Sequence, residues 1–227
     1  MIKCIKSLKE YQYILSFDLA KKITGYSLLD IQNNKVVLAG MINTAECKDD
    51  FVWDYYYNQI LAVLDHCLIE IGRENEDLLF VTKERLPNQN GKFSTIDTLQ
   101  SLAQVHAIFD LAVYHKGLEV YDYEGIHSVS VKAYFKSLLN IDKPQKEDIA
   151  EHIRKVYKDF DFSEYSLDVT DSLAVSMTLI GKKYNNDIAE EVKILKKELK
   201  NTKSNNKIEK IKNKIILLEG LKYDNNK

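Results

Sequence analysis

Four acidic residues occupy positions from which their carboxylates could act together. Asp18 ends an apolar run, Glu84 directly follows another, and Asp168 and Asp171 lie three residues apart at the start of an expected helix. Residues three apart share a helix face, so the two later carboxylates should point the same way. Strand-end and helix-capping acids are common, and each signal alone is therefore weak. Together they offer four hard oxygen donors, the ligand type that Mg²⁺ requires.

Such a cluster would also be electrostatically costly. Four carboxylates at one site repel one another and raise their own pKa values. The arrangement is therefore expected chiefly with a divalent cation bound to it.

Three strands are expected near the N-terminus. Their apolar and β-branched runs cover Tyr11 to Phe17, Ile23 to Ile31 and Lys35 to Ile42, with a turn at residues 32–34. The short connections predict an antiparallel meander. A glycine in the second strand, Gly25, would let another backbone come close beside the carboxylate of Asp18.

Helices then alternate with two further strands. A short run buried on both faces, Leu78 to Val81, precedes Glu84, so Glu84 would share a sheet edge with Asp18 if the two strands are parallel. Its alternative role is a salt bridge with Lys83 or Arg85. The other expected elements are an amphipathic helix over 50–73, a helix capped by Ser94 and ending near His115, a strand over 118–123, and helices over about 127–139, 145–157 and 167–183. This order predicts a mixed sheet with helices on its faces.

The last part of the chain has a different composition. Beyond about residue 186 it is rich in Lys, Glu, Asn and Ile, and two apolar stripes, 188–199 and 208–218, follow three- and four-residue steps. Polar residues 201–206 separate them. We interpret the segment as a helical hairpin, with one long helix as the alternative, and either could serve dimerisation or packing on the body.

The overall composition says more about the cellular compartment than about the function. The net charge of -2 hides a split, because residues 182–227 contain 13 Lys and 7 acidic residues. Three widely spaced cysteines fit neither a disulfide framework nor a zinc site, which indicates a reducing, cytoplasmic setting. No apolar run approaches the roughly 20 residues of a membrane span, and no signal peptide is expected.

In order and spacing, residues 12–181 resemble the RuvC branch of the ribonuclease H-like superfamily. The segment from Ile14 to Asp18 with Thr24-Gly25-Tyr26 is similar to the family's first motif, and Lys83-Glu84-Arg85 to its second. Further similar segments are Leu99 to Phe109, Val120 to Tyr123 with Val131-Lys132 and Lys146-Glu147, and the final motif from Asp168 to Ala174.

This resemblance implies both a fold and an activity. The fold is an α/β ribonuclease H-like nuclease domain over residues 1–184, with a mixed five-stranded sheet flanked by helices. The Lys-rich helical extension over 185–227 lies beyond the resemblance. The implied activity is that of a crossover junction endodeoxyribonuclease, which resolves Holliday junctions by paired phosphodiester hydrolysis and leaves 5′-phosphate and 3′-hydroxyl ends.

The resemblance also assigns roles to residues. Asp18, Glu84, Asp168 and Asp171 would hold two Mg²⁺ ions, with Mn²⁺ able to substitute and Asp18 bridging the pair. Lys146 is a catalytic candidate that would neutralise developing charge or contact phosphate. The candidates for contacting DNA are Lys132, Lys146, Arg85 and Phe93. Solvated helix lysines are the alternative interpretation of Lys132 and Lys146.

The chain departs from the family pattern after Glu84. The family often presents an aromatic wedge there that unstacks bases at the junction, whereas the third residue after Glu84 is Pro87 and the nearest aromatic is Phe93. At Ala20 and Ser172 the chain has one small residue where the family usually has another. Two alternative functions remain. One is a broader nuclease for forks and other branched DNA, and the other is a non-catalytic DNA-binding relative whose C-terminal helices recruit a partner.

A four-way junction presents two equivalent strands to cut, so a homodimer with one site per subunit is expected. The resemblance implies the helix over 94–115 as the interface, with the C-terminal hairpin as a second possibility. The composition, rich in Lys, Asn, Ile and Tyr, suggests an AT-rich genome. A compact resolvase of this kind would suit a phage, acting in the cytoplasm of its bacterial host.

Overall fold

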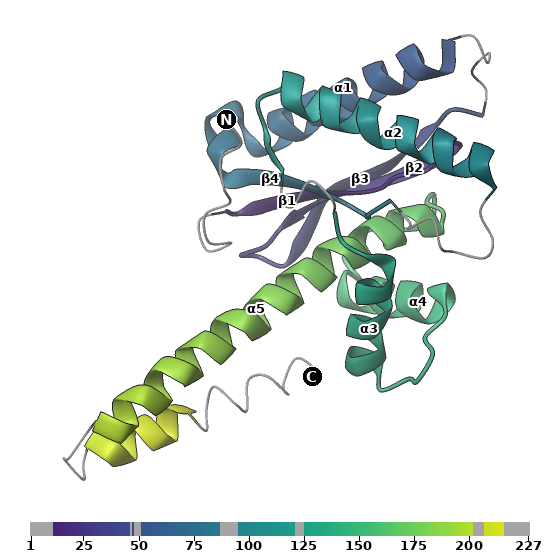
Figure 1. Cartoon of the computed structure of the whole chain (residues 1–227). Coiled ribbons are helices and arrows are strands. Elements are labelled where there is room, and N and C mark those ends of the chain that lie inside the picture. The colour runs from purple at the N-terminus through teal and green to yellow at the C-terminus, as the bar shows by residue number, and fades with distance from the viewer. Residues whose placement is uncertain are drawn as a thin grey trace.

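A five-stranded mixed sheet forms the centre of the molecule (Figure 1). The structure, a computed structural model, describes residues 11–45, 47, 51–86, 95–120, 125–201 and 207–215, with the backbone alone at 183–191 and 201. The strands are β1 (Tyr13–Asp18), β2 (Ile23–Asp30), β3 (Lys35–Asn43), β4 (Leu79–Lys83) and β5 (Glu119–Val120). They lie in the order β3-β2-β1-β4-β5, antiparallel on the β3 side of β1 and parallel on its β4 side. The expected α/β class is confirmed.

Helices cover both faces of this sheet. They are α1 (Val52–Ile71), α2 (Ile96–His115), α3 (Ser128–Leu139), α4 (Lys146–Val156) and α5 (Leu167–Asn201), with a 3₁₀ turn, η3, at Arg73–Leu78 and a last helix over 207–215. One face is covered by α1 and α2, whereas α5 crosses the other with α3 and α4 beyond it (Figure 1). In the described ranges, no helix is long and apolar enough to cross a membrane.

The central strand β1 is buried on both faces. Leu15 and Phe17 join the core under α1 and α2, whereas Ile14 joins the core with α3, α4 and α5. Successive side chains of a strand point to opposite faces, so an almost continuous apolar run suits a strand between two layers. Asp18 is the last residue of this strand and emerges where the apolar run stops.

Small polar residues allow α5 to lie close on the sheet. Four fully buried serines fill the contact, namely Ser16 and Ser27 from the strands and Ser172 and Ser176 from α5. The hydroxyl of Ser176 donates to Ser16 Oγ at 2.7 Å, and that of Ser172 to Ser27 Oγ at 2.9 Å. Because the buried hydroxyls hydrogen-bond one another, the close packing of α5 on the sheet gives these polar groups partners.

The C-terminal segment forms the predicted hairpin, but its first helix starts much earlier than expected. The predicted end near residue 183 is wrong, because α5 runs unbroken to Asn201. The expected domain boundary at 184 and 185 therefore falls inside one helix. Val192 and Leu195 are buried against Ile211 and Ile215 of the last helix, which confirms the hairpin.

Smaller differences occur at element ends. Thr95, not Ser94, is the N-cap of α2, and its hydroxyl accepts a bond from the Thr98 backbone N–H at 3.2 Å. The strand expected over 118–123 is described only at Glu119–Val120. Ser94, Pro87 and Phe93 lie outside the described residues.

Candidate functional site

Asp18 and Glu84 stand side by side at the ends of two adjacent parallel strands. The register pairs Phe17 with Lys83, and the Glu84 backbone N–H donates to the Phe17 carbonyl oxygen at 2.9 Å. The two carboxyl groups hydrogen-bond each other. The expectation that Glu84 shares the edge of Asp18 is therefore confirmed.

The pKa of Asp18 is strongly raised. Burial raises the pKa of Asp18 to about 8, helped by the hydrogen bond and charge of Glu84 and by the charge of Asp171, while Lys146 acts against the shift. A carboxyl with this pKa is largely protonated at neutral pH. A positive charge beside such a carboxyl would favour its ionised form.

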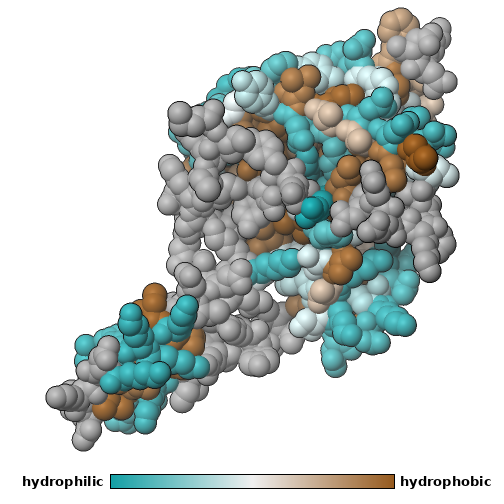
Figure 2. Space-filling view, viewed as in Figure 1, coloured by the Kyte–Doolittle hydropathy of each residue, from teal (hydrophilic) through white to brown (hydrophobic). Residues whose placement is uncertain are grey.

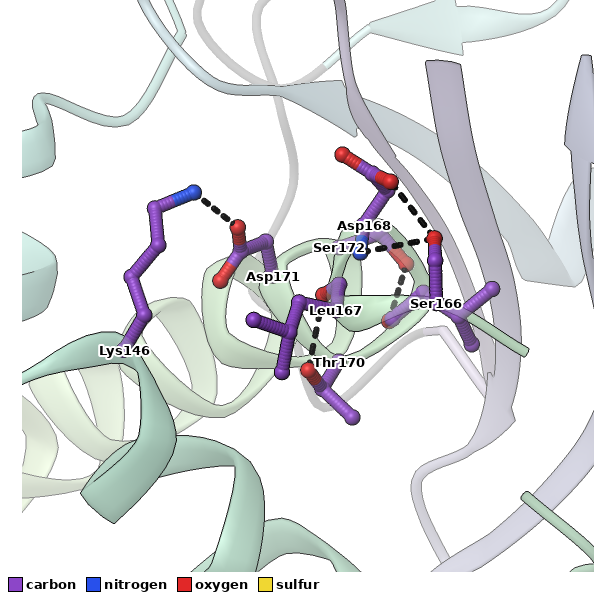
Figure 3. Close-up of polar contacts among 8 residues, drawn as sticks. Lys146, Ser166, Leu167, Asp168, Thr170, Asp171 and Ser172 are labelled. Carbon is purple, nitrogen blue, oxygen red and sulfur yellow. Dashed lines mark hydrogen bonds and ion pairs between the residues drawn. The ribbon is translucent and has the colours of Figure 1, made fainter. Parts of the chain in front are cut away.

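Asp171 faces the same region from α5 and bonds Lys146. The carboxylate of Asp171 forms an ion pair with Lys146 Nζ (Figure 3). Lys146 is the first residue of α4, whose start is fixed by a capping box between Gln145 and Asp148. Burial acts to lower the pKa of Lys146, but the bond to Asp171 and the charges of Asp18 and Glu84 outweigh it, so the pKa is raised. The Lys146 ammonium thus sits where three carboxyl groups attract a cation.

Asp171 is itself a weakened acid. Its burial raises the pKa, the ion pair with Lys146 opposes the rise, and the charges of Asp168 and Glu147 add to it. The carboxylate therefore depends on a nearby positive charge for its ionised form.

Asp168 has a different partner. It lies on the first turn of α5 like Asp171, but its Oδ2 accepts a hydrogen bond from Ser166 Oγ at 2.5 Å (Figure 3). The two carboxylates of this turn thus have different partners, Lys146 for Asp171 and Ser166 for Asp168. Throughout the described ranges, no group of three or more His, Cys, Asp or Glu side chains has the arrangement of a metal site.

A glycine sets the separation of α5 from the strand that carries Asp18. Gly25 is the β2 residue that pairs with Asp18. A Cβ atom added to Gly25 would lie 2.0 Å from the Asp168 carbonyl oxygen and 2.9 Å from the Val169 nitrogen. The close backbone approach expected at Gly25 is confirmed, and the approaching backbone is that of the Asp168 turn.

Lys83 does not bond Glu84, so the alternative of a salt bridge between Glu84 and Lys83 is wrong. Its side chain is 2% exposed on the opposite face of the sheet, where its Nζ pairs with Asp110 of α2. The ammonium also lies 5.3 Å from the centre of the Phe109 ring. Burial and the charge of Lys83 lower the pKa of His106 to about 4. Strand alternation could have predicted this direction for Lys83, because neighbouring residues of a strand point to opposite faces.

The other candidates for DNA contact are placed as follows. Lys132 is exposed on α3. Arg85 is half-buried, and its backbone N–H donates to the Ile126 carbonyl oxygen at 2.9 Å. Phe93 lies outside the described residues.

Comparison with known proteins establishes the fold. No family model and no curated protein sequence matches the chain. A structure of Thermus thermophilus RuvC in complex with a Holliday junction substrate is similar, with 14% sequence identity and a TM-score of 0.56, over 78% of this chain and 96% of that one. A second structure of RuvC from Thermus thermophilus gives 14% and 0.55, over 77% and 95%. The expected ribonuclease H-like fold, in its RuvC form, is therefore confirmed.

Proposed function

We propose that this protein is a divalent-metal-dependent DNA endonuclease that resolves four-way junctions by paired phosphodiester hydrolysis. The observation that carries the proposal is the juxtaposition of Asp18 and Glu84, with Asp171 and Lys146 facing them from two helices. The likeness of the fold to a protein that has been seen with a Holliday junction substrate supports the choice of DNA.

The donors in this region suit Mg²⁺. Carboxylate oxygens are the hard ligands that this ion prefers. Burial, helped by neighbouring carboxylates, raises the pKa values of Asp18 and Asp171, so a bound cation would stabilise their ionised forms. Asp18, Glu84 and Asp171 would hold the ions, and Asp168 would join them by exchanging its Ser166 hydrogen bond. We propose two Mg²⁺ ions, with Mn²⁺ able to substitute. When bound, such ions polarise the phosphodiester and lower the pKa of a water molecule.

The protein's own groups would change their bonding when a cation and DNA bind. The Asp18–Glu84 pair gives up its shared proton and becomes fully anionic. Asp171 is released from Lys146, which then donates to a phosphate oxygen of the DNA and neutralises charge that develops there. Lys146 would thus neutralise the carboxyl groups in the free protein and contact phosphate in the complex.

Paired cutting requires two copies of the site. The outer side of α2 exposes three large apolar residues, Ile96 at 73%, Leu111 at 47% and Tyr114 at 76%. Exposed apolar side chains on one helix favour a protein contact, so we propose a homodimer with α2 at its interface. Sedimentation of only monomer at micromolar concentration, with and without DNA, would contradict this part.

Two substrate ranges compete within this proposal, four-way junctions alone or branched DNA in general. The loop that would form a wedge contains Pro87 and Phe93, so a broader nuclease for forks and flaps is the competing function. The test is cleavage of labelled four-way junctions, forks, flaps and linear duplexes with Mg²⁺ and with EDTA. Paired nicks in the junction alone support resolution, and equal cutting of forks supports the broader nuclease. If folded protein cuts none of them with Mg²⁺ or Mn²⁺, the non-catalytic relative is the better account.

We also propose that residues 1–184 form the nuclease unit and that 185–227 extend it, in the cytoplasm of the cell that contains the DNA. The presence of all four acidic residues weighs against the non-catalytic relative, because such a relative has no need to keep them.

A further inference from the structure

The far end of α5 and the last helix concentrate positive charge. Residues 192–200 and 207–215 contain eight lysines and two glutamates, a net charge of +6, in a chain whose total is -2. All eight lysines are exposed. In Figure 2 this hairpin forms a lobe at the lower left, with hydrophilic side chains around a few apolar ones.

Four of these lysines form one row along α5. Lys193, Lys196, Lys197 and Lys200 follow steps of three, one and three, so they share one side of the helix. We name them the distal lysine row. The adjacent stripe of Val192, Leu195 and Leu199 packs against the last helix, which fixes the direction of the row.

The opposite flank of the hairpin carries a weaker charge. Glu198 lies on the other side of α5 from the row, and its carboxylate forms a 2.9 Å ion pair with Lys207 of the last helix. Lys207, Lys210 and Lys214 follow steps of three and four and share this flank. Lys207 is thus bonded to an acid within the hairpin.

The helix α5 connects the row directly to the proposed catalytic site. Asp168 and Asp171 lie on its first turn and the row lies 25 to 32 residues after Asp168. At 1.5 Å per residue this separation is about 40 Å. A duplex that rises 3.4 Å per base pair covers that length in about 12 base pairs, a little more than one helical turn. Figure 1 shows α5 extending away from the sheet, with the hairpin at its far end.

We propose that the distal lysine row binds the phosphate backbone of a duplex DNA arm about one turn from the cleaved phosphate. The position of the arm rests on the proposed function, which puts the reacting phosphate at the Asp168 end. Lysine is a point charge that contacts phosphate without reading sequence, which suits a regular row of lysines. The apolar side chains of the hairpin are largely turned into its own core, so a membrane is a poorer match for this surface.

The test compares two variants of the full-length protein that remove equal charge. Lys193, Lys197 and Lys200 are replaced by Gln in one, and Lys207, Lys210 and Lys214 in the other. Binding to four-way junctions with arms of about 6 or about 20 base pairs is measured in EDTA over a range of salt, so that only the longer arms reach the row. Thermal unfolding verifies that both variants are folded.

With long arms, we expect the row variant to bind at least about tenfold more weakly than wild type and to lose about 2.7 from the salt slope, or 0.9 for each phosphate contact removed. The opposite-flank variant should lose less, and short arms should abolish the difference between the variants. Unchanged binding by the row variant, equal loss with both arm lengths, or equal loss in both variants would overturn the inference. A change of the row variant from dimer to monomer would overturn it in favour of a protein contact.

Cleavage distinguishes this inference from the proposed function. Both variants should still cut the short-armed junction with Mg²⁺, because the carboxylates are intact. If wild type binds DNA through the row but cuts nothing, the proposed function fails and the binding surface stands.

Discussion

Gly25 of β2 lies against the backbone of Asp168, so closely that an added Cβ atom would stand 2.0 Å from the Asp168 carbonyl oxygen. The same glycine pairs with Asp18 across the two strands. One residue without a side chain therefore allows the strand end that carries Asp18 and the first turn of α5 to come together.

Replacing Gly25 with Ala should move the start of α5 and separate the proposed ligands. A displacement of about 1 Å at a reacting centre can cost about 100-fold in rate, and we expect a loss of that order. Junction cleavage and urea unfolding are the measurements. Gly117→Ala is the control, because its new Cβ would meet nothing within 4 Å although its φ of +70° makes the change strained. Wild-type cleavage by Gly25→Ala would contradict this role.

Lys146→Gln removes the cation that faces three carboxyl groups. We expect cleavage to fall by about 10- to 1000-fold, because charge developing on the phosphate loses its partner. Lys136→Gln is the matched control, since Lys136 also pairs with an aspartate, Asp142, but at the surface of α3. If the two variants cut equally well, Lys146 is only a surface ion-pair partner.

Asp110→Asn should destabilise the protein more than Lys83→Met does. The asparagine leaves the ammonium of Lys83 buried at 2% exposure without its counter-charge, at a cost of about 3 kcal/mol. The methionine leaves only the carboxylate of Asp110, which is 35% exposed and can be hydrated. Urea unfolding of both variants gives the comparison, and the reverse order would show that the pair is not held as described. Asp65→Asn, which removes the partly exposed pair with Lys116, should cost less than about 1 kcal/mol.

Stability should fall in acid because of His106. Its pKa is about 4 in the folded protein and about 6.5 when unfolded, so between these values the unfolded chain binds the extra proton. The free energy of unfolding therefore rises with pH across this window, by about 2 kcal/mol from pH 5 to pH 7. Urea unfolding of wild type and His106→Gln at both pH values isolates the effect. Equal pH dependence in the two proteins would contradict it.

Sequence reasoning succeeded where a local pattern and strand direction decided the outcome. The strand ends at Asp18 and before Glu84 follow from where apolar runs stop, and parallel pairing then brings the two acids together. The close approach at Gly25 also followed from the absence of a side chain. The alternative pairing of Lys83 with Glu84 is wrong, because alternation along the strand points Lys83 away from Glu84.

Other features depend on contacts that the spacing of residues does not specify. Asp168 bonds the hydroxyl of Ser166, two residues earlier, a contact that the three-residue spacing of the two aspartates does not specify. The helix α5 continues through residues 184–187, none of which is Gly or Pro. Each of these residues lowers helix stability by less than about 0.7 kcal/mol relative to Ala. Packing of Val192 and Leu195 in the hairpin stabilises the continued helix beyond them.

The most direct test of the proposed metal-dependent site is cleavage of an immobile four-way junction by Asp18→Asn with saturating Mg²⁺. Asp142→Asn is the control, since it changes an exposed aspartate outside the proposed site by the same atoms. The account predicts that Asp18→Asn binds the junction but makes no paired nicks, whereas Asp142→Asn and wild type cut it and EDTA stops both. Cleavage by Asp18→Asn at the wild-type rate would contradict the account.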